Sequence, residues 1–384
     1  MPKTLVVDDD PDVETLLRGQ LSGRQISDGF DFVFARSEAQ ALQILGSEKN
    51  IDIGLVVIDS QTISGMELFR HMKGGAPRIP RIALTSTNDL ATIRLAMNNG
   101  AVDFLVKPIA ADDLIATIDK VFRDCEERRK SWRTEAQLAA IRKEIDIAVD
   151  IQRRILPTRF PERGDLGLFA RMKPAQEMSG DFFDYFEVGA DKLGLVVADV
   201  SGKGIPAAFF MAVARTLIRA TAMTGAEPGA CLEQANVLLC RHDIPGMFVS
   251  VFYSILDTAT WELAYANGGH LPPYLIYGDE DNGGVETLAG GEGTVLGIQE
   301  DLIYQQDTIA LEAGDALFYY TDGLTEAFDI DRNQFTDERL IEYLLTNRDL
   351  SAHALAENVF AFVDMFTAGA PQSDDITSLV IKRF

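Results

Sequence analysis

Cysteine, histidine and positive charge are all scarce in this chain of 384 residues. The three cysteines, Cys125, Cys231 and Cys240, lack the spacing of metal ligands and do not suit a disulfide framework, so they indicate a reducing compartment. The formal net charge of −24 argues against general nucleic-acid binding, because that binding needs basic surface to replace counterions. We therefore expect a cytoplasmic protein with no nucleic-acid partner.

Long apolar runs are missing as well. We find no stretch that approaches the roughly 18 apolar residues of a membrane-spanning helix, so we expect no membrane partner. Residues 8–10 are aspartates and interrupt the early apolar run that a signal peptide would need. A hydrophobic content of 47% and a charged content of 24% are typical of soluble globular proteins. The length predicts two or three domains.

Short apolar runs and helical patterns alternate over the first 125 residues. Five runs, among them "GLVVID" and "RIALTS", have the composition of buried strands. This alternation predicts an α/β fold with a doubly wound, five-stranded parallel sheet. Polar residues stand at the ends of these strands, namely Asp8, Asp9, Asp59, Thr85 and Lys107. They should meet at one edge, because sites in such sheets lie beyond the carboxyl ends of the strands.

These five side chains suit phosphoryl chemistry. Three neighbouring carboxylates repel one another unless a cation joins them, and oxygen ligands suit Mg²⁺. A carboxylate held between a metal and a lysine can accept a phosphoryl group. An acid at a strand end is by itself an ordinary loop residue, but the five polar residues in this order favour a site.

Residues 3 to about 123 resemble a response-regulator receiver domain. The segment "LVVDDDP" matches the acidic pair of that family, and "KP" at residues 107–108 matches its lysine and proline. The resemblance implies that Asp59 is the phosphoacceptor and that Lys107 contacts the phosphate. It also implies that Thr85 and Phe104 are the switch residues that sense phosphorylation.

The same resemblance implies a bound Mg²⁺ in this domain. Its ligands would be Asp8, Asp9, Asp59 and a loop carbonyl, which we place on Gln61. The loop after Asp59, "DSQTISGMEL", departs from the family because it lacks the usual proline and is two residues shorter. The departure leaves the loop ligand and the rate of phosphorylation open.

A helical connector follows the receiver-like region. Residues 121–156 contain no glycine, and Pro157 follows them directly as the terminal proline of the segment. One apolar stripe runs along it, formed by Leu138, Ile141, Ile145, Ala148, Ile151 and Ile155. The stripe fits an amphipathic helix packed on its own domain, or a short coiled coil that makes a homodimer. A 3, 3 step in the spacing breaks the heptad register, and both alternatives stay open, with the dimer favoured.

The pattern changes after Pro157. Strand-like runs now occur in adjacent pairs, such as "MFVSVFYSILD" and "WELAYANGG", which are joined by "TAT" as in a hairpin. Two helical stretches interrupt them. Many strands with few helices predict an α+β domain of antiparallel sheets packed as a sandwich, with flanking helices. The chain therefore divides into a receiver domain at 1–123, a helical linker at 124–156 and a further domain at 157–384.

Four aspartates again stand at strand ends or in turns of this last domain. They are Asp181 in "SGDFFD", Asp199 in "ADVSGKG", Asp322 in "TDG" and Asp374 in "DDIT". Each motif taken alone fits a turn. Together, without histidine or cysteine, they suit Mg²⁺ or Mn²⁺ rather than zinc. Four carboxylates can hold two such ions about 3.5–4 Å apart, and the pair can activate water for direct attack on a phosphoryl group.

In this order, the four motifs resemble the PPM family of metal-dependent serine/threonine phosphatases. The resemblance covers residues 145 to 384, and "YANGGHLPP" and "IQRRILP" fit the bacterial branch that dephosphorylates anti-anti-sigma factors. It implies that the four aspartates are catalytic metal ligands for two Mn²⁺ or Mg²⁺ ions, with the backbone carbonyl of Val200. Asp375 would replace Asp374 if the register differed by one. Asp184 would support the ligands.

Two further residues bear on this resemblance. Lys203 stands in "SGKG" where the branch often has histidine, so its effect on rate is open. We identify no arginine that must hold the phosphate, which fits the bacterial branch. His270 in "GGHLPP" is more typical of a hydrogen-bonded structural residue than of a catalytic base.

The two resemblances together imply a two-component response regulator whose output is a protein serine/threonine phosphatase. Its substrate would be a phosphorylated, STAS-type anti-anti-sigma protein. A histidine kinase or phosphotransfer protein would phosphorylate Asp59, and the helical linker would pass the signal on to the segment "AVDIQRRILP". One alternative is a catalytically weak phosphatase fold that acts as a phosphorylation-controlled binding switch. Another is hydrolysis of a small phosphorylated metabolite.

Overall fold

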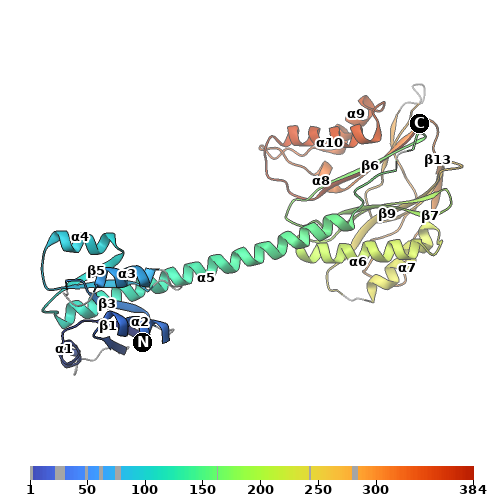
Figure 1. Ribbon diagram of the computed structural model, residues 1–384. Helices are drawn as coiled ribbons and strands as arrows, with labels where there is room; N and C mark the ends of the chain where they lie inside the picture. Colours follow the sequence, from blue (N-terminus) through green and yellow to red (C-terminus); the bar gives the residue numbers. More distant parts are fainter. Residues whose placement is uncertain are drawn as a thin grey trace. The chain divides into compact units, whose positions relative to one another are not determined.

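The computed structural model describes residues 3–21, 31–47, 51–59, 64–73, 79–161, 163–241, 244–278 and 284–384. The chain forms two compact units, residues 1–140 and 141–384. The division falls inside one long helix (Figure 1). The predicted domain boundaries at residues 123 and 156 flank this division and stay predictions.

The first unit is a parallel sheet with the strand order β2-β1-β3-β4-β5. Its strands are β1 (Lys3–Val7), β2 (Asp31–Ala35), β3 (Ile53–Val57), β4 (Arg81–Thr85) and β5 (Ala101–Val106). Its helices are α1 (Val13–Leu21), α2 (Glu38–Ser47), α3 (Gly65–Lys73), α4 (Leu90–Asn98) and the first part of α5 (Ala111–Ile155). Strands β3 and β4 are buried throughout, as their apolar sequences require. The predicted doubly wound fold is confirmed.

Helix α5 is continuous over 45 residues. The sequence predicts this continuity, because no glycine or proline separates the last helix of the receiver-like region from the connector. In the first unit, Arg129 of α5 forms an ion pair of 3.2 Å with Asp52, the residue just before β3. In the second unit, α5 ends beside the buried Leu156. One uninterrupted helix therefore belongs to both units.

The second unit contains two antiparallel sheets with the orders β13-β10-β9-β8-β7 and β12-β11-β14-β15-β6. The strands of the first are β7 (Phe182–Gly189), β8 (Lys192–Val200), β9 (Val249–Asp257), β10 (Glu262–Gly268) and β13 (Asp307–Ala310). Those of the second are β6 (Leu166–Lys173), β11 (Tyr274–Ile276), β12 (Val285–Thr287), β14 (Ala316–Tyr320) and β15 (Ile376–Arg383). The predicted hairpin is the β9–β10 pair.

Side chains from both sheets form a shared apolar core that includes Val197, Phe252, Leu317 and Leu379. Helices cover the outer faces, with α6 and α7 on the first sheet and α10 on the second. The helices of this unit are α6 (Ile205–Ala222), α7 (Pro228–Cys240), α8 (Asp322–Thr325), α9 (Asp337–Thr346) and α10 (Ala352–Thr367). The predicted sandwich with flanking helices is confirmed (Figure 1).

Helix α6 corrects one prediction from the sequence. Its 18 residues are long and apolar enough to span a membrane by length and composition, whereas we expected no such stretch. One face of α6, including Phe210 and Met211, is buried in the core of the second unit. Its Arg215 and Arg219 pair with Asp184 on β7. We therefore assign α6 to the protein core.

Candidate active site

The four predicted aspartates lie at one end of the sandwich. Asp181 immediately precedes β7, and Asp199 is the last residue but one of β8, which pairs antiparallel with β7. In the other sheet, Asp322 follows β14, and Asp374 lies two residues before β15. Because β14 and β15 are also antiparallel, the end of one strand meets the start of the next. The fold thus brings together four residues that span nearly 200 positions of the sequence.

Asp181 and Asp199 form one half of this cluster, in which Asp181 is buried and Asp199 is partly buried. Asp181 is 2% exposed, and its Oδ2 accepts a hydrogen bond of 2.7 Å from Thr321 Oγ1. Burial and the nearby Asp199 raise the pKa of Asp181 well above its ordinary value. Burial and Asp322 likewise raise the pKa of Asp199 to about 7. The fold therefore holds these carboxylates where their negative charges are costly.

Asp322 and Asp374 form the other half, and both are partly buried. Burial and the charge of Asp374 raise the pKa of Asp322. Lys203 lies next to them, with its Nζ 2.9 Å from Asp374 Oδ2. The same Nζ donates a hydrogen bond of 2.6 Å to the backbone carbonyl of Ser373. The departure from the family at residue 203 thus places a cation against one of the predicted metal ligands.

The donor set of this cluster fits divalent cations that prefer oxygen. In the described part of the chain, no group of three or more Asp, Glu, His or Cys side chains is arranged to hold a metal ion as it stands. Thr321 and Lys203 engage Asp181 and Asp374 instead. The raised pKa values of Asp181, Asp199 and Asp322 indicate too little positive charge around these three acids, and Mg²⁺ or Mn²⁺ would supply it.

Glycine keeps the backbone beside the cluster accessible. A Cβ atom on Gly180 would lie 3.0 Å from the carbonyl oxygen of Val200, the predicted backbone ligand. A Cβ atom on Gly323 would lie 2.0 Å from the carbonyl oxygen of Asp375. Gly323 has no room for a side chain, and a side chain at residue 180 would crowd the Val200 carbonyl, which fits the glycines in "TDG" and "SGD".

Asp374 and Asp375 have distinct surroundings, although the sequence leaves their register open. Asp375 is 5% exposed and accepts hydrogen bonds from Ala175 N at 2.7 Å, Gly180 N at 2.8 Å and Ser179 Oγ at 2.9 Å. Asp374 instead faces Lys203 and contributes to the raised pKa of Asp322. Asp375 therefore shapes the loop before Asp181, and Asp374 is the better candidate ligand.

Asp184 has a different environment from the one predicted. Its buried carboxylate pairs with Arg215 at 2.9 Å and with Arg219 at 3.1 Å, both on α6. We expected it to support the metal ligands, but strand alternation directs it to the opposite side from Phe183, toward α6. Asp184 therefore attaches α6 to β7, and the sequence contained no local signal for the two arginine partners.

Gln152 near the end of α5 is a contact that sequence reasoning missed. Its Nε2 donates to the Ser179 carbonyl at 2.7 Å, and its Oε1 accepts from Ser179 N at 3.1 Å. Gln152 is only 4% exposed, although its neighbours Ile151 and Arg153 on α5 are exposed. Ser179 Oγ in turn accepts from Asp181 N at 3.0 Å. The long helix is thus connected to the first aspartate through two residues.

Residues predicted to form the phosphorylation site lie together in the first unit. Lys107 Nζ lies 2.5 Å from Asp8 Oδ2, and Thr85 Oγ1 donates to Asp59 Oδ2 at 3.1 Å. The backbone N–H of Ser86 donates to the same oxygen. Among the described residues, the other oxygen of Asp59, Oδ1, is buried and has no hydrogen-bond partner. That oxygen fits a site for a cation or a phosphoryl group.

Asp9, Phe104 and Gln61 are the other residues predicted for this site. Asp9 follows Asp8 beyond β1 and is partly buried. Phe104 lies on β5, beside Ala83 of β4, and packs partly buried against the core of the first unit. Gln61 lies outside the described residues, so its predicted role as a ligand stays a prediction.

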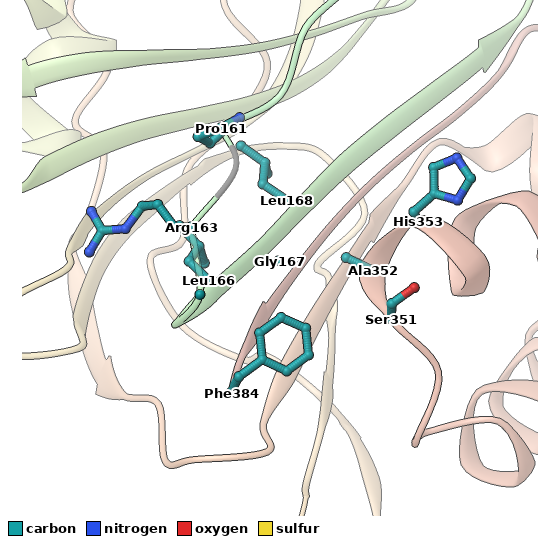
Figure 2. Close-up of a pocket in the computed structure, with 10 residues that line it drawn as sticks. Pro161, Arg163, Leu166, Gly167, Leu168, Ser351, Ala352, His353 and Phe384 are labelled. Carbon is teal, nitrogen blue, oxygen red and sulfur yellow. The ribbon is translucent and has the colours of Figure 1, made fainter.

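A pocket of about 500 Å³ lies elsewhere in the second unit. Figure 2 shows its lining, which comes from the start of β6, the start of α10 and Phe384 near the end of β15. None of the four aspartates lines this pocket. The chemistry suggested by the sequence therefore belongs to the carboxylate cluster, not to this cavity.

Comparison with known families agrees with this geometry. The family model described as Stage II sporulation protein E (SpoIIE) matches residues 189–384, about half of the chain. The chain belongs to the SpoIIE family. A second model, the response regulator receiver domain, matches residues 4–119. The matches confirm the predicted combination of a receiver domain and a PPM-type, or PP2C-like, phosphatase domain.

Individual relatives of this SpoIIE-family protein also support a phosphatase domain. Phosphoserine phosphatase RsbU of Bacillus subtilis is 30% identical over 244 residues, which are 63% of this chain and 71% of RsbU. The structure of the SiaA-PP2C domain of Pseudomonas aeruginosa is 26% identical with a TM-score of 0.57, covering 65% of this chain and 99% of that domain. The predicted enzyme class, a protein serine/threonine phosphatase, is confirmed.

The receiver domain has relatives of another kind. Transcriptional regulatory protein GlrR of Escherichia coli is 34% identical over 115 residues, which are 30% of this chain and 25% of GlrR. The length of this match is close to that of the receiver match at residues 4–119. The relatives named here include a phosphatase and a transcriptional regulatory protein. Similarity to a receiver domain therefore does not by itself identify the enzyme.

Proposed function

We propose that this chain is a cytoplasmic two-component response regulator with a metal-dependent phosphoprotein phosphatase as its output. The observation that carries the proposal is the convergence of Asp181, Asp199, Asp322 and Asp374 at one end of the sandwich. Asp59, with Thr85 and Lys107 in the same unit, is the proposed regulatory phosphorylation site. The receiver similarity supports a histidine kinase or phosphotransfer protein as the phosphoryl donor.

In this proposal, the four aspartates and the Val200 carbonyl hold two Mn²⁺ or Mg²⁺ ions. When bound, such ions supply an activated water for direct hydrolysis of a phosphate ester. Thr321 keeps Asp181 oriented through its hydrogen bond. Lys203 neutralises Asp374 before the substrate binds, and it can then provide positive charge to the substrate phosphate. Gly180 leaves room beside the Val200 carbonyl.

The proposed substrate is a phosphoserine or phosphothreonine on a STAS-type anti-anti-sigma protein. The resemblance to the bacterial branch supports this, as does similarity to RsbU, which is named a phosphoserine phosphatase. In the first unit, the proposed Mg²⁺ is held by Asp8, Asp9, Asp59 and Gln61. The buried Asp59 Oδ1 without a partner among the described residues supports such a ligand.

Substrate class can be tested with the full-length chain and a phosphoserine-bearing STAS protein. We expect phosphate release that requires Mn²⁺ and stops with a chelator. We expect kcat/KM for the phosphoprotein to exceed that for p-nitrophenyl phosphate by about 100-fold or more, because contacts remote from the phosphate contribute to transition-state binding. Both rates can be measured by the release of inorganic phosphate or nitrophenol.

Two results would contradict this proposal in different ways. Equal kcat/KM values for the phosphoprotein and for small phosphate esters would favour a metabolite phosphatase. Tight binding of the phosphoprotein without any release of phosphate would favour the binding-switch alternative, and the Lys203–Asp374 pair is the feature that would explain such weak catalysis.

Helix α5 is the proposed route of regulation. The Gln152–Ser179 pair connects it to the residues that precede Asp181. Half of the apolar stripe is more than half exposed, namely Leu138, Ile141 and Ile151, whereas Ile145, Ala148 and Ile155 are partly buried. The exposed members favour a partner helix over packing on the same chain. We propose that a second copy of the chain covers this stripe in a homodimer.

An insertion in α5 tests whether the helix transmits the signal. Two extra residues at Ala139 turn the following helix by roughly 200°, so we expect phosphorylation of Asp59 to lose its effect on phosphatase turnover. Repeating residues 133–139 adds seven residues, which turn the following helix by roughly 700°. Its rotational orientation then differs from that of the wild type by only about 20°. We expect this control to keep the response. Turnover with and without phosphorylation would be compared for both variants, and equal responses would show that α5 is only a tether.

A further inference from the structure

His270 lies in the segment between β10 and β11, strands that belong to different sheets of the second unit. It is 7% exposed. Two hydrogen bonds to Asn267 hold its backbone, because His270 N donates to Asn267 Oδ1 at 2.7 Å and Asn267 Nδ2 donates to the His270 carbonyl at 2.9 Å. The imidazole is therefore presented from a rigid loop.

Both ring nitrogens of His270 have partners. Nε2 lies 3.1 Å from the carbonyl oxygen of Tyr320, and Nδ1 lies 2.8 Å from Ser250 Oγ. A carbonyl oxygen can only accept, so Nε2 carries the proton and Nδ1 accepts from the serine hydroxyl. Burial lowers the pKa of His270 to about 4, so the ring keeps this neutral form at neutral pH.

The two partners of the ring belong to opposite halves of the carboxylate cluster. Ser250 on β9 is directly opposite Asp199 in the β8–β9 register, and its Oγ lies 3.4 Å from the Asp199 carbonyl. Tyr320 is the last residue of β14, two positions before Asp322. The residue between them, Thr321, donates to Asp181. One imidazole thus connects the Asp199 strand in one sheet to the Asp322 turn in the other.

We infer that His270 is a positioning residue that sets the separation of Asp199 and Asp322, and through it the metal affinity of the site. This inference rests on the proposed metal-dependent function. Apolar side chains hold the sheets together but have no directional preference, whereas the two imidazole hydrogen bonds define a distance and an angle. Groups that orient ligands in this way typically change metal affinity by 10–100-fold when they are replaced.

Three substitutions of His270 in the full-length chain test this inference. His270→Phe keeps a planar ring and removes both hydrogen bonds, so we expect Mn²⁺ to bind roughly 10–100-fold more weakly. In His270→Gln, the amide nitrogen can still donate to Tyr320. In His270→Asn, the amide oxygen can still accept from Ser250. We expect each of these two variants to recover part of the lost affinity. Mn²⁺ binding would be measured by calorimetry without substrate.

His353→Phe is the matched control. His353 lies on α10 and lines the pocket of Figure 2, away from the four aspartates. We expect its Mn²⁺ affinity to equal that of the wild type. Thermal unfolding in chelator would report the stability of each variant apart from metal binding.

The possible outcomes separate this inference from the proposed function. Unchanged Mn²⁺ affinity in folded His270→Phe, even with a lower melting temperature, would make His270 a structural residue only and overturn the inference. If that variant does not fold, wild-type Mn²⁺ affinity in both the Gln and Asn variants would overturn it equally. Absence of Mn²⁺ binding by the wild type itself would overturn the proposed metal site and the inference with it.

Discussion

Asp199→Asn should abolish metal-dependent phosphatase activity while the second unit stays folded. Asp199 is central to the cluster, since it interacts with Asp181, Asp322 and Asp374. The neutral amide of asparagine removes one negative charge from the proposed ligands, so the site should bind divalent cations more weakly. Loss of metal-assisted catalysis is worth several kcal/mol, and about 4 kcal/mol corresponds to a roughly 1000-fold lower kcat. Phosphate release in saturating Mn²⁺ measures the effect.

The stability of the same variant provides a second readout. Because burial and neighbouring acids raise the pKa of Asp199, replacing its carboxylate relieves repulsion in the metal-free protein. We therefore expect its melting temperature in chelator to equal or exceed that of the wild type. Asp257→Asn at the end of β9 is the control, since Asp257 accepts its hydrogen bonds from an exposed turn and should tolerate the change. Turnover of Asp199→Asn close to the wild-type value would refute the assignment.

Asp59→Ala should abolish phosphorylation of the first unit. In the structure, Asp59 is the acid that contacts Thr85 and Ser86 and has a buried oxygen without a partner among the described residues. Alanine has no carboxylate to form the acyl phosphate, so we expect complete loss of labelling, not a partial decrease. Incubation with a small phosphoryl donor and Mg²⁺, followed by intact-protein mass spectrometry, measures the added phosphoryl group.

The matched control for this experiment is Asp31→Ala. Asp31 begins β2 and is exposed, and its carboxylate lies 3.8 Å from the Lys3 ammonium. We expect it to be labelled like the wild type. If Asp59→Ala gained a phosphoryl group as readily as Asp31→Ala, another residue would be the acceptor and the regulatory part of the proposal would fail.

Much of the architecture follows from local patterns. Fully buried strands such as β3 have continuous apolar sequences, and helices alternate with them, so the parallel sheet could be predicted. The connector could be predicted as continuous with α5, because no residue in it breaks a helix. The hairpin of β9 and β10 follows from two β-rich runs and a short turn. Each of these features depends on residues close together in the sequence.

Several contacts of the candidate site could not be predicted in this way. Asp184 stands in the same short motif, "SGDFFD", as the predicted ligand Asp181. Strand alternation nevertheless places its side chain against Arg215 and Arg219. Asp374 and Asp375 are adjacent in the sequence, but in the folded loop their side chains point to different partners. Asp374 contacts Lys203, and Asp375 accepts from Gly180 N. The Gln152–Ser179 pair joins the end of a helix to a loop 27 residues later. None of these partners follows from spacing in the sequence.

By itself, the sequence determined the two families, the elements of both units and the aspartates that carry the proposed chemistry, because motifs and hydrophobic periods are properties of short segments. Only the tertiary structure decided which side chains support those aspartates. Thr321, Gln152 and His270 act through hydrogen bonds that close when two sheets and a helix pack together. Such bonds depend on directions and distances of about 3 Å between segments far apart in the chain, and no local pattern encodes these.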